Sequence, residues 1–300
     1  MISIREAAEI IRAGGLVAFP TETVYGLGAN ALDPAAVQKI FEMKGRPETS
    51  PLIVHVASVE MARTIVADWP PLAGELARQW WPGPLTLVLP KKSLVPDTVT
   101  AGLPTVGVRM PNHPIALELI EEAGVPVAAP SANRFTGLSP TTADHVRAVF
   151  GNVLPVLEGG PCAVGIESTV VAIEDGKLKL LRPGMISLGE IEHAAAHVTG
   201  ASHPSPGMHE KHYSPRTRLI LVRSASELPD RTGAYVWRAA LGPTARAVRM
   251  PLDAEPYAAQ LYRVLHQLDA ENWPWIAVEM PPDTPDWVAI CDRLRRAAGG

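Results

Sequence analysis

The chain contains very little cysteine. Its 300 residues include two cysteines, Cys162 and Cys291, which lie far apart and form no CxxC pair. Structural zinc sites and dithiol redox centres need clustered cysteines, so this sequence offers neither. Sparse, unpaired cysteine is typical of proteins that stay in a reducing compartment. Cysteine chemistry is therefore not expected to carry the function.

Excess positive charge and long hydrophobic runs are also missing. The net charge is −4 at pH 7, which argues against broad, nonspecific binding of nucleic acid, although a local basic groove stays possible. No apolar run approaches the ~18 residues needed to cross a bilayer. The N-terminal segment carries Arg5, Glu6 and Glu9, which is unlike a signal peptide. These features predict a soluble, cytoplasmic protein with no membrane partner.

What the chain does contain is an alternation of helix and strand patterns. Ser3 and Glu6 form a capping box, Asp33 precedes a proline at a helix start, and Ser187 with Glu190 caps a later helix. The remaining patterns predict helices over 34–44, 59–67, 72–80, 114–122, 142–149, 256–270 and 286–297. They predict strands over 16–20, 51–56, 85–89, 105–110, 125–129, 153–157, 218–222, 233–237, 246–250 and 275–280, and a hairpin over 168–181 that turns at Asp175 and Gly176.

This alternation indicates the α/β class and two domains. We expect a larger domain over residues 1–200, with a twisted mixed sheet and flanking helices. Residues 201–216 lack periodicity and contain several prolines, which is typical of a linker. A small Rossmann-like α/β domain is expected over residues 217–300.

A dinucleotide fingerprint is suggested by Gly26, Gly28 and Ala31, which match G-x-G-x-x-A. The context does not fit, because the five residues 21–25 separate the preceding strand from Gly26 and no acidic residue follows at the required distance. The glycines are better interpreted as part of an unusual loop that brings the backbone close to another group. No P-loop motif occurs in the sequence.

Histidines and serines offer alternative chemistry. His209 with His212, and His193 with His197, have a spacing that metal sites use, but neither pair has a convincing third ligand. Ser131 and Ser168 raise the possibility of a serine nucleophile, yet neither lies in a G-x-S-x-G elbow. Solvated histidines and ordinary loop serines are the simpler interpretations.

Cations next to prolines provide the stronger signal. Lys44 and Arg46 flank Gly45 in "KGRP", Arg109 lies in "GVRMP", and Arg182 lies in "LLRPG". Lys44 alone could serve the helix dipole, which stabilises a terminal cation by about 0.3–1 kcal/mol. Arg109 and Arg182 each end a predicted strand, strand ends bind ligands in α/β sheets, and guanidinium groups suit carboxylates and phosphates. Together they favour an anion site over isolated surface charges.

Seven collinear segments resemble the YrdC-like threonylcarbamoyl-adenylate synthases. They are "FPTETVYGLGANA", "KGRP" with "PLIVHV", "WWPGPLTLVL", "GVRMPNHPIALELI", "PVAAPSAN", "GIESTVV" and "LLRPG". The segment "SPGM…KHYSP" and the small domain after it are similar to the two-domain Sua-type branch. "DWV" near the C-terminus departs from the family's usual glycine-rich sequence, which leaves the role of that domain open.

The resemblance implies a reaction of L-threonine, bicarbonate (or CO2) and ATP that gives threonylcarbamoyl-AMP and pyrophosphate. A downstream tRNA threonylcarbamoyl transferase would use this product, and Mg2+ would accompany ATP. Lys44 and Arg46 carry the family's catalytic signature. The implied ATP-binding residues are Lys44, Arg46, Pro130, Ser131, Asn133, Ser139, Arg182 and Tyr213, the last in a lid over the nucleotide. The implied threonine-binding residues are Thr23, His55, Arg109, Ala129 and Ser168, with no metal ligands among the protein side chains.

Two other functions remain compatible with the same fold. One is a tRNA or double-stranded RNA binding module, which would need a basic concave face. The other is a carbamoyl transferase that acts on carbamoyl phosphate. The relatives of that kind carry extra acylphosphatase and zinc-finger segments, for which this sequence has no counterpart.

Overall fold

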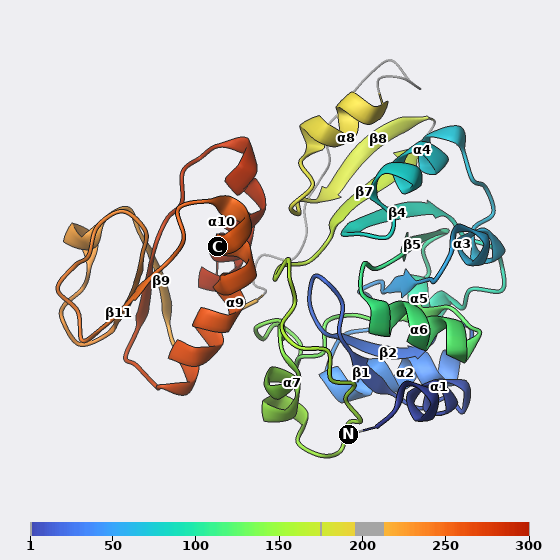
Figure 1. Ribbon diagram of the computed structural model, residues 1–300, viewed down its shortest axis with the longest axis horizontal. Helices are drawn as coiled ribbons and strands as arrows, with labels where there is room; N and C mark the ends of the chain where they lie inside the picture. The colour runs from blue at the N-terminus through green and yellow to red at the C-terminus, as the bar shows by residue number, and fades with distance from the viewer. Residues whose placement is uncertain (1, 175, 196–212, 300) are drawn as a thin grey trace.

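The structure is a computed structural model that describes residues 2–174, 176–195 and 213–299. In those residues two sheets lie in separate units (Figure 1). The larger sheet has the strand order β1-β2-β6-β3-β5-β4-β7-β8 and mixes parallel and antiparallel pairs. Its strands are β1 Val17–Phe19, β2 Gly26–Asn30, β3 Ile53–His55, β4 Leu85–Pro90, β5 Thr105–Arg109, β6 Val127–Ala128, β7 Thr169–Glu174 and β8 Lys177–Arg182.

Helices flank this sheet and bury their apolar faces on it. The described helices of the larger unit are α1 Ile4–Arg12, α2 Pro34–Lys44, α3 Val59–Ile65, α4 Pro71–Trp80, α5 Asp97–Thr100, α6 Pro114–Ala123, α7 Ala143–Phe150 and α8 Leu188–Ala195. α1 and α6 share one apolar cluster with β1, whereas α2 and α4 pack in another with β3 and β4. The mixed sheet with flanking helices confirms the predicted fold class.

Local sequence signals explain where the helices begin and end. The Ser3 hydroxyl accepts from the Glu6 backbone, and the Glu6 carboxylate accepts from the Ser3 backbone, so the predicted capping box is present. The Asp33 side chain caps α2, and Gly45 ends it in the left-handed region at φ 63°. That conformation costs glycine little. It turns the chain sharply between Lys44 and Arg46.

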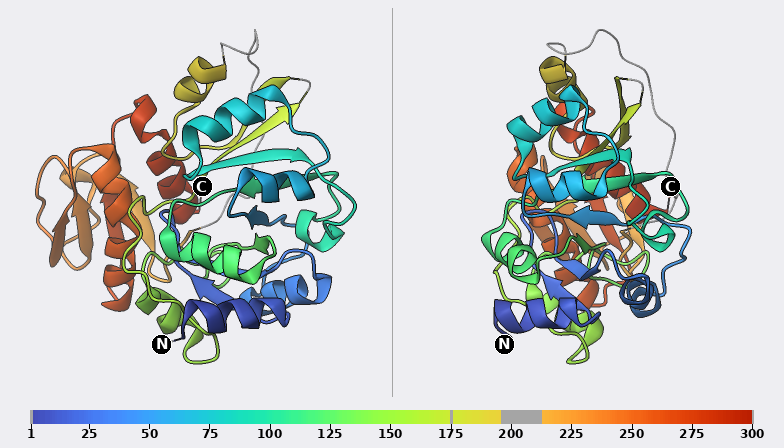
Figure 2. Two further views of the ribbon diagram at one scale, coloured as in Figure 1. Left: turned by 45° about the vertical axis from the view of Figure 1, so that its right-hand side comes forward. Right: turned by 90° about the vertical axis from the view of Figure 1, so that its right-hand side faces the viewer.

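The smaller unit is a parallel four-stranded sheet with the order β11-β10-β12-β9. Its elements are β9 Leu219–Val222, β10 Ala234–Trp237, β11 Arg246–Arg249, β12 Ile276–Glu279, α9 Ala254–Ala270 and α10 Val288–Ala298, with short 3₁₀ turns at Ala225–Glu227 and Pro285–Trp287. α9 and α10 lie between the small sheet and the larger unit (Figures 1 and 2). The helices of the smaller unit therefore face the larger one.

Two local predictions were wrong. Residues 26–30 form strand β2, not a loop, because Gly26 and Gly28 let the strand pass close to the Phe19 ring. A Cβ atom at Gly28 would lie 2.8 Å from Phe19 Cε1. The backbone therefore does come close to another group, as expected, but it does so in a strand and not in a loop. Residues 153–157 form no strand and contribute only a single bridge between Val156 and Ala18.

Candidate functional site

Three parallel strands end at one edge of the large sheet. β3 pairs in parallel with β5, and the pairings through β4 and β7 show that β8 runs in the same direction. Their last residues are His55, Arg109 and Arg182. All three line one cleft, which encloses about 620 Å³ including space open to solvent.

Arg109 is held almost completely buried in this cleft. Nη1 donates to Thr23 Oγ1 at 3.0 Å, Nε donates to the Gly83 carbonyl at 3.2 Å, and Nη2 lies 2.7 Å from Glu22 Oε2. The contact with Glu22 is an ion pair without hydrogen-bond geometry, and neither Glu22 oxygen accepts a hydrogen bond within the described part of the chain. Arg109 therefore has a fixed guanidinium group that is suited to a carboxylate ligand.

His55 lies beside Arg109 as a neutral imidazole. Burial, and then the charge of Arg109, lowers the pKa of His55 to about 3. The ring packs edge-on against Phe19 at a centroid distance of 6.0 Å. Its Nδ1 is buried and has no hydrogen-bond partner among the described residues. At pH 7 His55 can donate or accept a hydrogen bond without adding charge to the cleft.

Arg182 is oriented by Ser168, the residue that precedes β7. Its Nε donates to the Ser168 carbonyl at 3.0 Å and its Nη2 donates to Ser168 Oγ at 2.9 Å. The same hydroxyl lies 2.8 Å from Thr86 Oγ1. Ser168 thus contacts an arginine and a threonine, and no histidine is bonded to it in the described structure, which disfavours a serine nucleophile.

Arg46 also borders the cleft. Nη2 donates to the Pro51 carbonyl at 3.2 Å, and the guanidinium lies 5.9 Å from the Phe135 ring centroid. Burial lowers the pKa of Arg46 to about 10, so it stays charged at neutral pH. Arg46, Arg182 and Tyr213 also line a second, larger cavity that continues from the cleft. Both guanidinium groups can therefore reach an anion that spans the two spaces.

Lys44 lies behind the wall of the cleft. Its Nζ donates to the carbonyl oxygens of Ser131 and Asn133, both at 2.6 Å. Burial, and then the nearby charge of Arg46, lowers the pKa of Lys44 well below its usual value. The lysine therefore fixes the turn that presents Ser131 to the cleft. A direct contact between Lys44 and ATP stays a prediction.

The structure brings together most of the residues predicted from the sequence. The described residues that line the cleft include Thr23, Arg46, His55, Arg109, Ala129, Pro130, Ser131, Ser168, Arg182 and Tyr213. Asn133 and Ser139 are buried behind it: the Asn133 amide donates to two backbone carbonyls, and the Ser139 hydroxyl donates to Glu167. Their contacts with ATP also remain predictions.

Sequence reasoning missed two carboxylates, Glu22 and Glu167. Both are buried, at 5% and 7% exposure, and each lies within 2.7 Å of an arginine nitrogen. The available signal was their place inside "TETVYG" and "GIESTVV", where an acidic residue stands among small and apolar ones. Buried carboxylates are rare unless they are paired.

The described residues contain no group of three or more His, Cys, Asp or Glu side chains that could hold an ion. His197, His209 and His212 lie outside the described residues. No helix that the structure describes is long and apolar enough to cross a membrane.

Two protein-family models match the chain, one after the other. The Sua5/YciO/YrdC family model, described as telomere recombination, matches residues 9–184. A second model, described as the C-terminal domain of threonylcarbamoyl-AMP synthase, matches residues 186–299. Each model covers one of the two sheets, which agrees with a chain of two structural units. The exact limits predicted for the linker, 201–216, remain a prediction because most of it lies outside the described residues.

Full-length relatives agree with these models. The threonylcarbamoyl-AMP synthases of Pyrococcus abyssi and Bacillus subtilis are each 41% identical and align with 99% of this chain and 94% and 93% of their own lengths. The crystal structure of P. abyssi Sua5 complexed with L-threonine has a TM-score of 0.88 at 40% identity, with 99% and 94% coverage.

A more distant likeness concerns the fold alone. A full-length HypF structure is 22% identical with a TM-score of 0.53, and the match covers 61% of this chain and 29% of HypF. It gives no support for carbamoyl transfer by this chain. The two family matches and the full-length relatives show that the chain belongs to the Sua5/YciO/YrdC family, in its two-unit form with a Sua5 C-terminal domain.

Proposed function

We propose that this chain synthesises L-threonylcarbamoyl-AMP from L-threonine, bicarbonate or CO2, and ATP, and that the product serves threonylcarbamoyladenosine modification of tRNA. It is a nucleotidyl-transferring enzyme, as its full-length relatives named threonylcarbamoyl-AMP synthase are. The observation that carries the proposal is the convergence of Arg46, Arg109 and Arg182 on one cleft. The solved relative with L-threonine supports threonine as the amino acid.

Arg109 would bind the carboxylate of threonine. Its guanidinium is already oriented by Thr23 and the Gly83 carbonyl, so little side-chain freedom is lost when the ligand arrives. His55, neutral at pH 7, would offer a hydrogen bond in the same place without attracting a second anion. Ala129 and Ser168 complete this part of the cleft. The amine of threonine is thereby directed away from Arg109 toward the open space.

Arg46 and Arg182 would bind the phosphates of ATP at the border of the two cavities. The threonine amine adds to CO2 and releases a proton to solvent, giving a carbamate whose oxygen attacks the α-phosphorus. A new P–O bond forms as the bond between the α-phosphorus and the bridging oxygen breaks, and pyrophosphate leaves with the electron pair. Two fixed guanidinium groups stabilise the charge that develops on the phosphates. No enzyme nucleophile is needed, because the carbamate supplies it.

Magnesium would enter with ATP. The described residues present no cluster of carboxylates for a dedicated protein site, and Glu167 in the cleft is already occupied by hydrogen-bond donors. The chain therefore fits an ion carried by the phosphates. When bound, Mg2+ would neutralise part of the polyphosphate charge. Tyr213, which lines both cavities, would cover the nucleotide.

Labelled bicarbonate tests the whole reaction. The full chain is incubated with ATP, Mg2+, [14C]bicarbonate and one amino acid at a time, and pyrophosphate and labelled adenylate are measured. We expect both products with L-threonine and much less with L-serine or L-valine. Pyrophosphate release that needs neither threonine nor bicarbonate would contradict the proposal.

Downstream transfer is tested separately. The labelled adenylate is added to a tRNA threonylcarbamoyl transferase complex with its tRNA, and label in the tRNA is counted. The same chain, mixed with tRNA alone at about 150 mM salt, tests direct contact. We expect label to reach tRNA only when the transferase is present. We expect no binding of tRNA by the chain alone, because its net charge of −4 gives it no general affinity for the phosphate backbone.

A further inference from the structure

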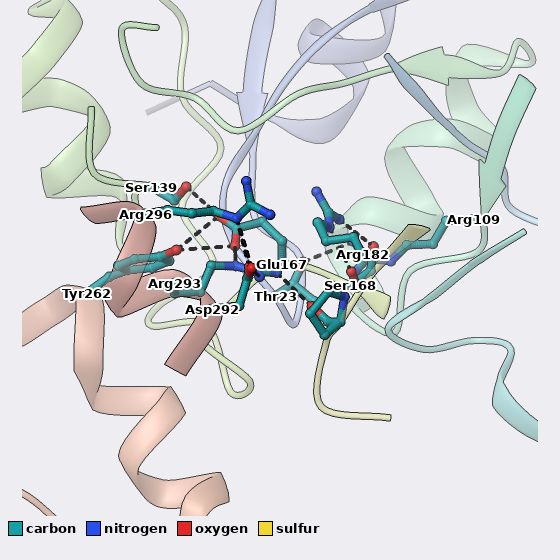
Figure 3. Close-up of polar contacts among 11 residues, drawn as sticks. Thr23, Arg109, Ser139, Glu167, Ser168, Arg182, Tyr262, Asp292, Arg293 and Arg296 are labelled. Atoms are coloured by element: carbon teal, nitrogen blue, oxygen red, sulfur yellow. Dashed lines mark hydrogen bonds and ion pairs between the residues drawn. The ribbon is translucent and has the colours of Figure 1, made fainter. Parts of the chain in front are cut away.

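A carboxylate in the cleft of the larger unit is bound by side chains of the smaller one. Glu167 lines the cleft, and its Oε2 accepts from Arg293 Nε at 2.7 Å. The Tyr262 hydroxyl donates to the same carboxylate at 3.2 Å, and the Ser139 hydroxyl donates to Oε1 at 2.6 Å. Figure 3 shows these side chains converging on Glu167. Arg293 and Tyr262 come from α10 and α9, respectively.

A free Glu167 carboxylate would compete with an anionic ligand for the arginines of the cleft. Burial disfavours its charged form, but Arg293, Arg182 and the bond from Ser139 outweigh burial and lower the pKa of Glu167. It is therefore an anion at neutral pH, close enough to Arg182 to attract it. Among the described residues Arg182 forms no ion pair, whereas Glu167 pairs with Arg293. The pair with Arg293 keeps the carboxylate from competing with phosphate for Arg182.

Arg293 also contacts the residue that follows Arg182 and the residue that precedes Ser168, the binding partner of Arg182. Its Nη2 donates to the carbonyl of Pro183 at 3.0 Å, and Pro183 directly follows Arg182. Its Nε holds Glu167, which directly precedes Ser168, the residue that orients Arg182. One guanidinium thus braces the two chain segments that position the Arg182 guanidinium. With 1% exposure, Arg293 makes these contacts away from solvent.

The same guanidinium supports Tyr213. The Arg293 Cζ lies 5.1 Å from the Tyr213 ring centroid, and the Tyr262 ring lies 6.0 Å away. Tyr213 has a positive φ of 64°, which is costly for a residue other than glycine. The Ser214 amide donates to the Thr136 carbonyl at 2.9 Å, which ties this segment to the larger unit. Tyr213 is therefore held between the two units where it lines the cleft.

We propose that Arg293, assisted by Tyr262, is a positioning residue through which the C-terminal unit sets the geometry of Arg182 and Tyr213 for the phosphates of ATP. This inference rests on the proposed function. Arg293 acts through Glu167, Pro183 and Tyr213 and lines neither cavity itself. The C-terminal unit is then part of the catalytic apparatus, and its removal or loosening weakens ATP binding even where the larger unit stays folded.

A purely structural role gives a different kinetic signature. If Arg293 only joined the two units, its loss would lower the fraction of folded protein and reduce kcat, with unchanged KM for ATP. A positioning role raises the KM and Kd for ATP, because the misplaced Arg182 binds ground-state phosphates less well. It changes the Kd for threonine much less, because Arg293 has no contact with Arg109 and reaches the threonine end of the cleft only through Glu167 and Ser168.

Conservative variants with matched controls separate these roles. Tyr262→Phe removes one hydroxyl from α9, and Tyr257→Phe is its control, since Tyr257 lies on the same helix, is equally buried and has no hydrogen-bond partner among the described residues. Arg293→Lys keeps the positive charge but loses the several N–H donors of the planar guanidinium. Its control is Arg295→Lys, which makes the same change at an exposed position of α10. All four are made in the full chain.

Steady-state pyrophosphate release is measured against ATP and threonine, with calorimetric Kd values for both ligands and thermal unfolding of each variant. We expect Tyr262→Phe to raise the KM and Kd for ATP about three- to tenfold, the usual range for the loss of one ordinary hydrogen bond. Arg293→Lys should raise them about ten- to a hundredfold. Both controls should stay within about twofold of wild type.

A double variant tests whether Arg293 acts through the carboxylate. In a Glu167→Gln background, Arg293→Lys should change the Kd for ATP less than it does in the wild type, because part of its role is already lost. Unchanged Kd and KM values for ATP in both Tyr262→Phe and Arg293→Lys would overturn the proposal. A fall in kcat alone, in step with lower unfolding temperatures, would also overturn it in favour of simple domain joining.

The outcomes also separate this inference from the proposed function. A wild-type chain that binds ATP but makes no threonine-dependent adenylate would refute the synthase function. The Kd values of the variants for ATP would still test the positioning role of Arg293. A wild-type chain that makes the adenylate, with variants that match their controls, would refute the role of Arg293 alone. A wild-type chain that binds no ATP would refute both.

Discussion

Replacing Glu22 with glutamine should destabilise the protein by removing the counter-ion of Arg109. The two side chains are 6% and 4% exposed, and their ion pair measures 2.7 Å. Breaking a buried pair by removing one charge costs about 3–5 kcal/mol, because the remaining charge stays buried without compensation. Glu22 accepts no hydrogen bond from the described residues, so we take the lower value of about 3 kcal/mol.

This value corresponds to a measurable change in unfolding temperature. Unfolding entropy of about 2.1 cal/mol/K per residue gives about 0.6 kcal/mol/K for cooperative unfolding of 300 residues, so Tm should fall by about 5 °C. Calorimetry of the full chain measures it. The matched control is Glu9→Gln, which breaks an exposed pair with Arg5 whose side chains are 56% and 83% accessible. Such pairs contribute about 0.5 kcal/mol or less, so the control should change Tm by about 1 °C at most.

Adding threonine gives the second half of this test. If Arg109 binds the threonine carboxylate, the ligand returns a negative charge to the guanidinium that Glu22→Gln leaves unpaired. Saturating L-threonine should therefore raise the Tm of Glu22→Gln by more degrees than it raises that of the wild type. A Tm for Glu22→Gln that equals the Glu9→Gln value would refute the reasoning about the buried pair. An equal threonine shift in both proteins would refute the assignment of Arg109 to the carboxylate.

Three further perturbations have defined outcomes. Lys44→Met and Arg46→Ala should each lower adenylate synthesis by about a hundredfold or more with a folded protein by circular dichroism, whereas Arg5→Ala at the exposed N-terminal helix should match the wild type. EDTA should abolish the activity and excess Mg2+ should restore it, as measured by pyrophosphate release. Burial, and then the charge of His266, lowers the pKa of His145 to about 4, below the value of about 6.5 in the unfolded chain. As the pH falls, the unfolded chain therefore binds this proton before the folded chain does. The free energy of unfolding should fall between pH 6.5 and pH 4. The urea midpoint of His145→Gln should vary less over that range.

Patterns along the chain predicted the elements and the cations well, because both depend on local chemistry. The placement of Arg109 and Arg182 at strand ends needed only the extent of an apolar run and the proline after it. The αL stop at Gly45 followed from a helix pattern that ends in glycine. Strand β2 was missed because its glycines fit against Phe19, and a contact between separate strands leaves no trace in local periodicity.

The carboxylates could not be assigned from the sequence for a different reason. Glu22 meets Arg109 over 87 residues of chain, and Glu167 meets Arg293 over 126, so their partners are set by packing alone. Lys44 shows the same limit: the sequence indicates a cation beside the site, but only the fold shows that its ammonium group binds the turn behind Ser131. Sequence patterns could thus place charges near the cleft without showing which charge faces a ligand.

The two buried carboxylates explain how a cleft with three arginines can be stable before substrates bind. An unpaired buried guanidinium would cost several kcal/mol, and Glu22 offsets that cost for Arg109. Arg182 donates hydrogen bonds to Ser168 but forms no ion pair among the described residues, while Glu167 nearby supplies negative charge that Arg293 holds in place. Substrate anions then add to a cleft whose positive charge is already partly balanced. Binding is therefore weaker than three free arginines would give, and this is what an enzyme that must release pyrophosphate and an adenylate requires.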